Sequence, residues 1–203
     1  MSAAPAPVVL LQASPHANGV TDAFAGAFAA PFPSQAVHCV ALRELAIAPC
    51  RGCNACSSPP HRCVLDTPHD ATQCLFAAMR SARLLVVCAP IYFYGLPALC
   101  KGFIDRGQQL WQAHRSGTLP PARVAGNTEP QALALLAGGR LRGEQLFAGA
   151  LLTLKYFFAL FDAPLVDTRC CYGLDDIATL GAAPNVLADI GALGQRWAQT
   201  LCP

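Results

Sequence analysis

The sequence predicts an α/β fold in which helices cover both faces of a parallel sheet. Short, continuous apolar runs alternate with helical patterns, and the chain shows neither an internal repeat nor an interdomain linker. Alternation of this kind is typical of β–α–β units, in which each strand is buried on both faces. The five runs expected to form strands are 8–13, 37–42, 84–89, 132–137 and 165–171.

The expected helices lie between these strands. The clearest strand, 84–89, is followed after a short loop by a helical pattern over 98–111, and the first strand by one over 21–30 that Pro31 and Pro33 end. Before the third strand, Thr67 is expected to cap a helix over 68–81, with Pro68 in its first turn. Two further helices are expected over 144–161 and 184–201.

Length and composition restrict the class of protein. The 203 residues are enough for a single domain over 1–203, and 54% hydrophobic against 13% charged residues excludes a disordered chain. A net charge of +2 gives no indication of nucleic-acid binding. The N-terminus shows no secretory signal and the longest apolar stretch, 146–161, is too short to span a membrane. We therefore expect a cytoplasmic protein without a membrane span.

The helix over 144–161 is apolar on two faces. One face of such a helix packs on the sheet, and the other is left for a second subunit. We therefore expect a homodimer or a homotetramer.

The loop after the first strand is a candidate anion site. It leads from a strand to a helix N-terminus, where backbone N–H groups and the helix dipole favour negative charge. No Walker A and no G-x-G-x-x-G motif is present, so a phosphate-terminated mononucleotide fits better than ATP or a dinucleotide. An ordinary turn with a helix cap is the alternative. The candidate residues are Ser14, His16, Asn18, Gly19 and Thr21.

A second candidate loop follows the third strand. Ligands of open α/β sheets bind outside the carboxyl ends of the strands, and at least one of three consecutive aromatic side chains there should be exposed to cover a planar ring. Aromatic packing against a helix is the alternative. The candidate residues are Pro90, Ile91, Tyr92, Phe93, Tyr94 and Gly95. Gly138 and Gly139, after the fourth strand, allow close approach of a ligand or form a plain turn.

The chain has 11 cysteines, and four of them form a C-x2-C-x2-C-x6-C run on a long loop at about 45–66. Four thiolates at this spacing suit a [4Fe-4S] cluster. The same ligands also suit zinc, and uncoordinated thiols or a redox disulfide are further alternatives. The candidate ligands are Cys50, Cys53, Cys56 and Cys63.

These motifs together resemble the NAD(P)H-dependent FMN reductase branch of flavodoxin-like proteins. Residues 14–21 are similar to its S-P-R-x-x-G-x-T phosphate loop, with His16 in place of Arg, and 90–97 to its P-V-Y-F-G-x-x-P flavin loop. Residues 101–106 match K-x-F-I-D-R, and the cysteine run is similar to that of the iron-sulfur flavoproteins. The resemblance covers roughly residues 8–106.

The resemblance implies a flavodoxin-like sheet in strand order 2-1-3-4-5. It also implies an enzyme in which FMN takes electrons from NAD(P)H and passes them to a small acceptor, with a [4Fe-4S] cluster as a further carrier. The alternatives are a non-enzymatic electron carrier that partners ferredoxin, and a zinc-stabilised binding protein without flavin. We expect Lys101, Asp105 and Arg106 to be mainly structural, and assign no side chain as general acid or base. The cysteine loop could reach the same sheet edge as the flavin.

Overall fold

The computed structural model describes residues 6–122 and 129–202 and contains a five-stranded parallel sheet in the order β2-β1-β3-β4-β5. The flavodoxin-like strand order expected from the sequence is therefore confirmed. The strands are β1 Val8–Gln12, β2 Val37–Ala41, β3 Leu84–Pro90, β4 Gln131–Gly138 and β5 Leu165–Tyr172.

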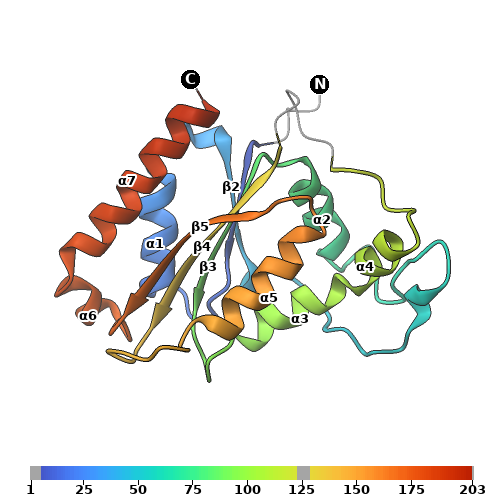
Figure 1. Cartoon of the computed structure of the whole chain (residues 1–203), viewed down its shortest axis with the longest axis horizontal. Helices are drawn as coiled ribbons and strands as arrows, with labels where there is room; N and C mark the ends of the chain where they lie inside the picture. The colour runs from blue at the N-terminus through green and yellow to red at the C-terminus, as the bar shows by residue number, and fades with distance from the viewer. Residues whose placement is uncertain (1–5, 123–128, 203) are drawn as a thin grey trace.

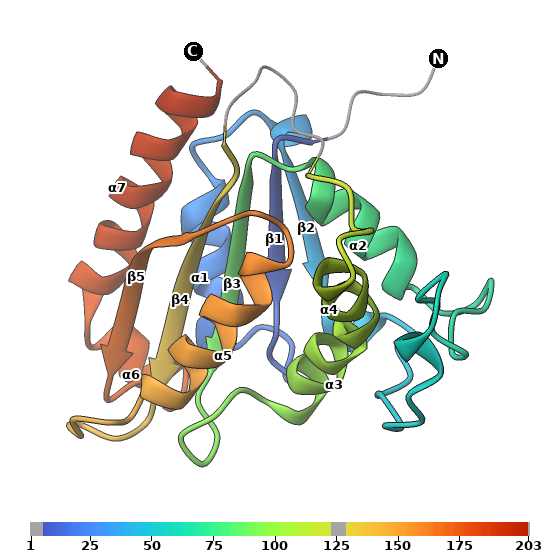
Figure 2. The ribbon, with the colours of Figure 1, turned by 45° about the vertical axis from the view of Figure 1, so that its right-hand side comes forward.

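Helices cover both faces of this sheet (Figures 1 and 2). Helices α1 and α7 pack on one face, and α2, α3 and α5 lie on the other, with α4 continuing beyond α3. The α-helices are α1 Val20–Ala29, α2 Thr72–Ser81, α3 Ala98–Arg106, α4 Gln108–Arg115, α5 Ala148–Ala159, α6 Ile177–Gly181 and α7 Pro184–Leu201. Three 3-10 turns are η1 Ser34–Ala36, η2 Leu42–Glu44 and η3 Ala55–Ser57.

The two-sided core follows from the period of two along a strand. In β1, Val8 and Leu10 join the cluster that includes α1 and α7, whereas Val9 and Leu11 join the cluster on the α2, α3 and α5 side. All four are almost fully buried. A strand with apolar residues on both faces has no polar alternation, which explains the continuous apolar run.

Helix α2 begins at Thr72, four residues after the expected start at Pro68. The reason is Asp70, whose carboxylate accepts hydrogen bonds from the backbone N–H of Thr72 at 3.0 Å and of Ala48 at 3.2 Å. Asp70 therefore accepts a hydrogen bond from the first residue of the helix, and residues 67–70 form a turn that precedes the helix. The predicted cap at Thr67 was wrong.

The helix expected over 98–111 is two helices, α3 and α4, which meet at Gly107. A Cβ at this position would lie 2.8 Å from the carbonyl oxygen of Ile104 and 3.2 Å from Cδ1 of Leu160. Glycine thus allows the junction to pack closely against the end of α5. The short helix α6 was not predicted; its capping box, formed by Asp176 and Thr179, is the sequence signal that marks it.

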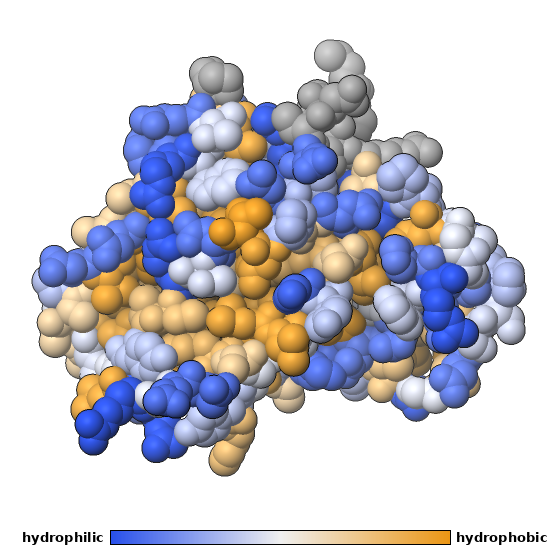
Figure 3. Space-filling model, in the orientation of Figure 1, coloured by the Kyte–Doolittle hydropathy of each residue, from blue (hydrophilic) through white to orange (hydrophobic). Residues whose placement is uncertain are grey.

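Helix α5 buries one face and exposes the other. Ala150, Leu154 and Phe158 are buried, whereas Leu152 is 58% and Tyr156 67% exposed. Figure 3 shows an apolar band across this side of the molecule. Within the described residues, no helix is long and apolar enough to cross a membrane. The single domain over 1–203 stays a prediction, because 1–5, 123–128 and 203 lie outside the described residues.

Candidate functional site

A cavity of about 400 Å³ opens where four strands end, and we call it the edge cavity. The loops after β1, β3, β4 and β5 each contribute to its lining, as expected for an open α/β sheet. These loops lie together at the lower end of the molecule in Figure 1. The predicted residues that line it are Ser14, His16, Gly19, Thr21, Pro90, Ile91, Tyr92 and Gly139.

The loop between β1 and α1 supplies hydrogen-bond donors to the edge cavity. Ser14 and Thr21 are only 4% and 2% exposed, and Ser14 Oγ accepts a hydrogen bond of 3.1 Å from the backbone N–H of His16. Within residues 6–122 and 129–202, the backbone N–H groups of Val20 and Thr21, the first two residues of α1, have no protein acceptor. Unpaired N–H groups at the start of a ten-residue helix suit a phosphate.

An ion pair holds this loop in shape. Asp22 in α1 accepts from Arg43 Nη2 at 2.9 Å, and the same carboxylate oxygen accepts from the backbone N–H of Asn18 at 2.8 Å. Asn18 has a φ of 59°, a left-handed conformation that asparagine tolerates. Asn18 does not line the edge cavity; it shapes the loop that does.

The aromatic loop after β3 forms a tight turn beside the edge cavity. Tyr92 and Gly95 exchange backbone hydrogen bonds of 3.0 Å, which forces Phe93 and Tyr94 to positive φ. Tyr92, Phe93 and Tyr94 are all exposed, so the expectation of at least one exposed ring is met. Gly95 closes the turn and does not line the cavity.

A second cavity, also of about 400 Å³, adjoins the first. The two share Ile91, Gly139 and Asp175, so they lie side by side along the sheet edge, and we call them together the groove. Phe93 and Tyr94 line this second part, and Tyr94 accepts a hydrogen bond of 2.7 Å from Arg140 Nη1. A groove of this length suits a ligand with a charged end and a planar end.

The segment after β5 lines the groove but was not predicted to do so. It contributes Leu174, Asp175, Asp176 and Ile177. A Cβ on Gly139 would lie 2.7 Å from Asp175 Oδ1, so glycine at that position admits the carboxylate. Gly138 packs against Leu146 and Phe147 instead of lining the groove. The rule that singled out the ends of the first, third and fourth strands would have found this segment too.

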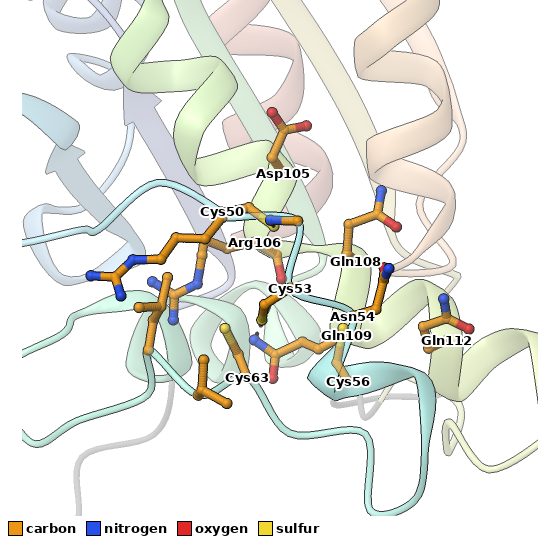
Figure 4. A pocket seen from close by; sticks show the side chains of 14 residues that line it. Cys50, Cys53, Asn54, Cys56, Cys63, Asp105, Arg106, Gln108, Gln109 and Gln112 are labelled. Carbon is orange, nitrogen blue, oxygen red and sulfur yellow. Dashed lines mark hydrogen bonds between the residues drawn. The ribbon is translucent and has the colours of Figure 1, made fainter.

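The four predicted cysteine ligands line a separate cavity of about 340 Å³, which we call the cysteine cavity. In Figure 4 the four cysteines surround it; Arg106, the last residue of α3, lies on the side of Cys50 and Cys63, and Gln108 and Gln112 of α4 lie on the side of Cys56. The other residues that line it are Arg51, Gly52, Asn54, Val64, Leu65, Asp105, Gln108, Gln109 and Gln112.

The thiols of this cavity influence one another. Burial raises the pKa of the Cys56 thiol, and repulsion from the thiolates of Cys63, Cys50 and Cys53 raises it further. The raised pKa favours the neutral thiol of Cys56 over its thiolate. Gly52 N–H donates to Cys50 Sγ at 3.4 Å. Among the described residues, no three or more His, Cys, Asp or Glu side chains form a group that could hold a metal ion.

Two side chains fix the cysteine loop to the body of the protein. Arg106 donates to Asp66 at 2.6 Å and to Asp70 at 2.7 Å, at the end of the loop. His61, which is 7% exposed, donates from Nδ1 to the carbonyl oxygen of Cys56 at 2.9 Å, and its Nε2 lies 3.0 Å from Ser116 Oγ beyond α4. The loop thus contacts the ends of both α3 and α4.

The position of the cysteine cavity differs from expectation. The cysteines lie beside the far end of α3 and share no lining residue with the groove. Because Arg106 pairs with the two aspartates that follow Cys63, it holds the loop away from the sheet edge. Helix α3 connects the two sites: it begins directly after the aromatic loop, ends at Arg106 and spans about 13 Å.

The strand order and the groove at the carboxyl ends of the strands together define a flavodoxin-like domain. The chain belongs to the NADPH-dependent FMN reductase family, whose sequence profile matches residues 6–142. It is 37% identical over 60 residues to an iron-sulfur flavoprotein of Methanosarcina thermophila; that match covers 30% of this chain and 29% of that protein.

Solved structures share the fold at low identity. An FMN-dependent NADH-azoreductase from Bacillus anthracis in complex with FMN has a TM-score of 0.61 at 11% identity, covering 94% of this chain and 99% of that one. An NAD(P)H:quinone oxidoreductase from Methanothermobacter marburgensis has a TM-score of 0.59 at 16% identity, covering 94% of each chain. The resemblance to the FMN reductase family that the sequence motifs indicated is thus confirmed.

The anchor at Asp70 predicts a pH dependence of stability. Burial opposes its ionisation, but hydrogen bonds from Arg106, Thr72 and Ala48 outweigh burial and lower the pKa of Asp70 from 3.8 to about 2. Because the folded pKa is the lower one, the stabilisation of about 2 kcal/mol is present above about pH 4 and is lost as the pH falls towards 2.

Urea unfolding measures this contribution. We expect Asp70→Asn to lower the free energy of unfolding by about 2 kcal/mol at neutral pH, with a smaller difference from wild type at pH 2 to 3. Asp105→Asn is the control: its ion pair with Lys101 is exposed, so it should change stability by less than about 1 kcal/mol. A difference between Asp70→Asn and wild type that stays constant down to pH 2 would contradict the assignment.

Proposed function

We propose that this chain is an FMN-dependent oxidoreductase that takes electrons from NAD(P)H and passes them to a small acceptor. The observation that carries the proposal is the groove at the sheet edge, which has unpaired N–H donors and buried hydroxyls at one end and exposed aromatic rings at the other. Membership of the NADPH-dependent FMN reductase family supports it.

The residues of the groove divide the work of binding. Ser14, Thr21 and the N–H groups at the start of α1 would hold the phosphate of FMN, and the aromatic loop would border its ring. Bound FMN would supply the chemistry, which is acceptance of hydride and release of electrons in pairs or singly. Asp175, between the two parts of the groove, can accept hydrogen bonds from the hydroxyls of the ribityl chain.

His16 is a weaker phosphate ligand than the other residues of its loop. Its side chain is exposed at the edge cavity, and an imidazole has fewer donors for a phosphate than the guanidinium of the Arg that the family's loop has at this position. The backbone donors and the hydroxyls of Ser14 and Thr21 therefore carry most of the binding energy in this proposal.

For the cysteine cavity we propose a [4Fe-4S] cluster held by Cys50, Cys53, Cys56 and Cys63. Four thiols line one cavity of about 340 Å³, and thiolates are the ligands that such a cluster takes. Because no three of these side chains form a metal-holding group among the described residues, the loop would have to close around the cluster on binding. The match to a relative named as an iron-sulfur flavoprotein supports the proposal. A zinc ion bound by the same four thiolates is the alternative to the cluster.

A second candidate function is a non-enzymatic electron carrier with ferredoxin-like partners. The exposure of Cys53 favours it, because a cluster there would lie near the surface and could exchange single electrons with another protein. Rapid one-electron reduction with slow or absent NAD(P)H oxidation would distinguish this function from the enzyme.

We further propose that the protein is a cytoplasmic homodimer that pairs through the exposed face of α5. Leu152, Tyr156 and Val166 border an open cavity of about 770 Å³ between α5 and β5. Lys155 and Asp167 also line it, so a two-fold axis can place each lysine near the aspartate of the other copy. This arrangement would bury the apolar face that the sheet leaves uncovered.

The phosphate loop is tested by FMN binding. We expect Ser14→Ala/Thr21→Ala to weaken FMN affinity by roughly tenfold for each hydroxyl removed, because each hydroxyl would donate to a charged phosphate. Thr200→Ala is the control, since its hydroxyl bonds only within α7, to the carbonyl of Arg196. Titration of apoprotein with FMN measures the affinity; full affinity in the double variant would reject the loop assignment.

The cysteine ligands are tested by anaerobic purification with counts of flavin, iron, sulfide and zinc. We expect wild type to contain all except zinc, and Cys63→Ser to lose most of its iron while it keeps flavin. Cys74→Ser is the control, because Cys74 is exposed and lies outside the cysteine cavity. Flavin without iron in wild type would reject the cluster and spare the enzyme, whereas colourless protein with zinc would reject both.

The dimer is tested by analytical ultracentrifugation. We expect Leu152→Asp to shift the protein from dimer to monomer, because the charge would be buried in the interface. Leu141→Asp is the control: Leu141 is 86% exposed but lies after β4, away from α5. A wild-type monomer, or a dimer unchanged by Leu152→Asp, would contradict the proposed interface.

A further inference from the structure

The second part of the groove, beside the edge cavity, contains an arginine that pairs with no carboxylate. Arg140 lies in the loop after β4 and is the only basic side chain among the described residues that line this part. Within residues 6–122 and 129–202 its guanidinium makes one hydrogen bond, to Tyr94 Oη at 2.7 Å, and no ion pair. The other N–H groups of the guanidinium therefore remain available to a ligand.

Tyr94 orients this guanidinium. It accepts the hydrogen bond, and the centroid of its ring lies 5.8 Å from Arg140 Cζ, within the distance of a cation–π contact. Asp175 lines the same part of the groove but forms no ion pair with Arg140 in the part of the chain that the structure describes. The positive charge is thus held in one direction and is not compensated by the carboxylate beside it.

A fully exposed aromatic side chain lines the same part of the groove as this charge. It belongs to Phe93, at the tip of the turn after β3. Phe93 and Tyr94 have φ of 49° and 63°, a left-handed conformation that is strained for residues other than glycine. Strain of this kind is concentrated at ligand-binding sites, because the surrounding structure must impose it. The exposed ring of Phe93 suits a planar ligand, on which it can stack.

The phosphate of FMN leaves this charge unused in the proposed function. It would bind at the start of α1, and none of the candidate residues of that loop lines the second part of the groove. An anion at Arg140 would therefore belong to a different molecule, one that reaches the groove from the side of the aromatic turn.

We infer that Arg140 and Phe93 determine the specificity for the electron acceptor, and that this acceptor is a planar aromatic compound of the quinone type with an anionic substituent. Phe93 stacks on the ring, and Arg140 donates hydrogen bonds to the carboxylate or sulfonate. In the overall reaction NAD(P)H and one proton reduce the quinone to the hydroquinone and leave NAD(P)⁺, so two electrons and two protons reach the acceptor. The inference rests on the proposed function and names the class of its acceptor.

The test is steady-state kinetics of the full-length protein with bound FMN, with naphthoquinone and naphthoquinone sulfonate as acceptors. The measured quantity is the ratio of kcat/KM for the sulfonate to kcat/KM for the neutral quinone. Comparison of this ratio between variants cancels the difference in reduction potential of the two compounds. We expect Arg140→Gln to lower the ratio by about tenfold, because a charge-assisted hydrogen bond is lost, and Arg140→Lys, which keeps the charge, to lower it less. Arg142→Gln is the control: Arg142 is exposed but lines neither part of the groove, so its ratio should equal that of wild type.

A second measurement needs wild type alone. The same ratio should fall as sodium chloride is added, because salt screens the attraction between an exposed guanidinium and an anion. A ratio that does not change with salt would overturn the inference, as would a ratio that does not change in Arg140→Gln.

Further readouts separate the acceptor from the other anions of the reaction. A raised KM for NAD(P)H in Arg140→Gln, with the ratio unchanged, would assign Arg140 to the phosphates of the nucleotide and overturn the inference. A tenfold loss of FMN affinity in Arg140→Gln would assign Arg140 to the cofactor and overturn it as well. Wild type that binds no FMN, or that reduces neither quinone, would overturn the proposed function and this inference together.

Discussion

The burial of both faces of the parallel sheet is the constraint on which the rest of the structure depends. Strands such as β3 are apolar on both sides, so helices must cover both faces and leave only strand ends and long connections exposed to ligands. The groove lies at exposed strand ends, namely the carboxyl ends of β1, β3, β4 and β5. The cysteine cavity is lined in large part by a long connection, the one between β2 and α2.

Arg106 relates these two places. It ends the helix that begins at the aromatic loop, and its ion pairs with Asp66 and Asp70 hold the cysteine loop against that helix. A loop position that separated the aspartates from Arg106 would leave a buried charge without a partner, which is strongly destabilising. The ion pairs therefore favour one position of the loop. In this account one helix therefore connects the flavin end of the molecule to the cysteine end.

Local patterns predicted most of the fold, and contacts between distant residues explain what they missed. Strand β3 lies where the apolar run predicted it, and α7 over 184–201 as expected. The late start of α2 depends on Asp70, which is bound by Arg106 from 36 positions further along the chain. The break at Gly107 depends likewise on contact with Leu160. No local propensity carries such information.

The candidate sites divide in the same way. Motifs pointed to Ser14, Thr21 and Tyr92, and these residues do line one groove. Asp175 lies in no motif and was missed, although it follows a predicted strand. Spacing alone gave the four cysteines, but their distance from the groove follows from the anchors of the loop.

The central proposal is that the chain binds FMN in the groove and a second redox group at the cysteine cavity. An anaerobic titration with NAD(P)H, which counts the electrons taken up per bound flavin, tests this claim most directly. The account predicts that the protein takes up more electrons than its flavin alone can hold, and that the excess appears in the iron–sulfur spectrum. Uptake that matches the flavin alone, in protein that contains its full complement of iron, would contradict it.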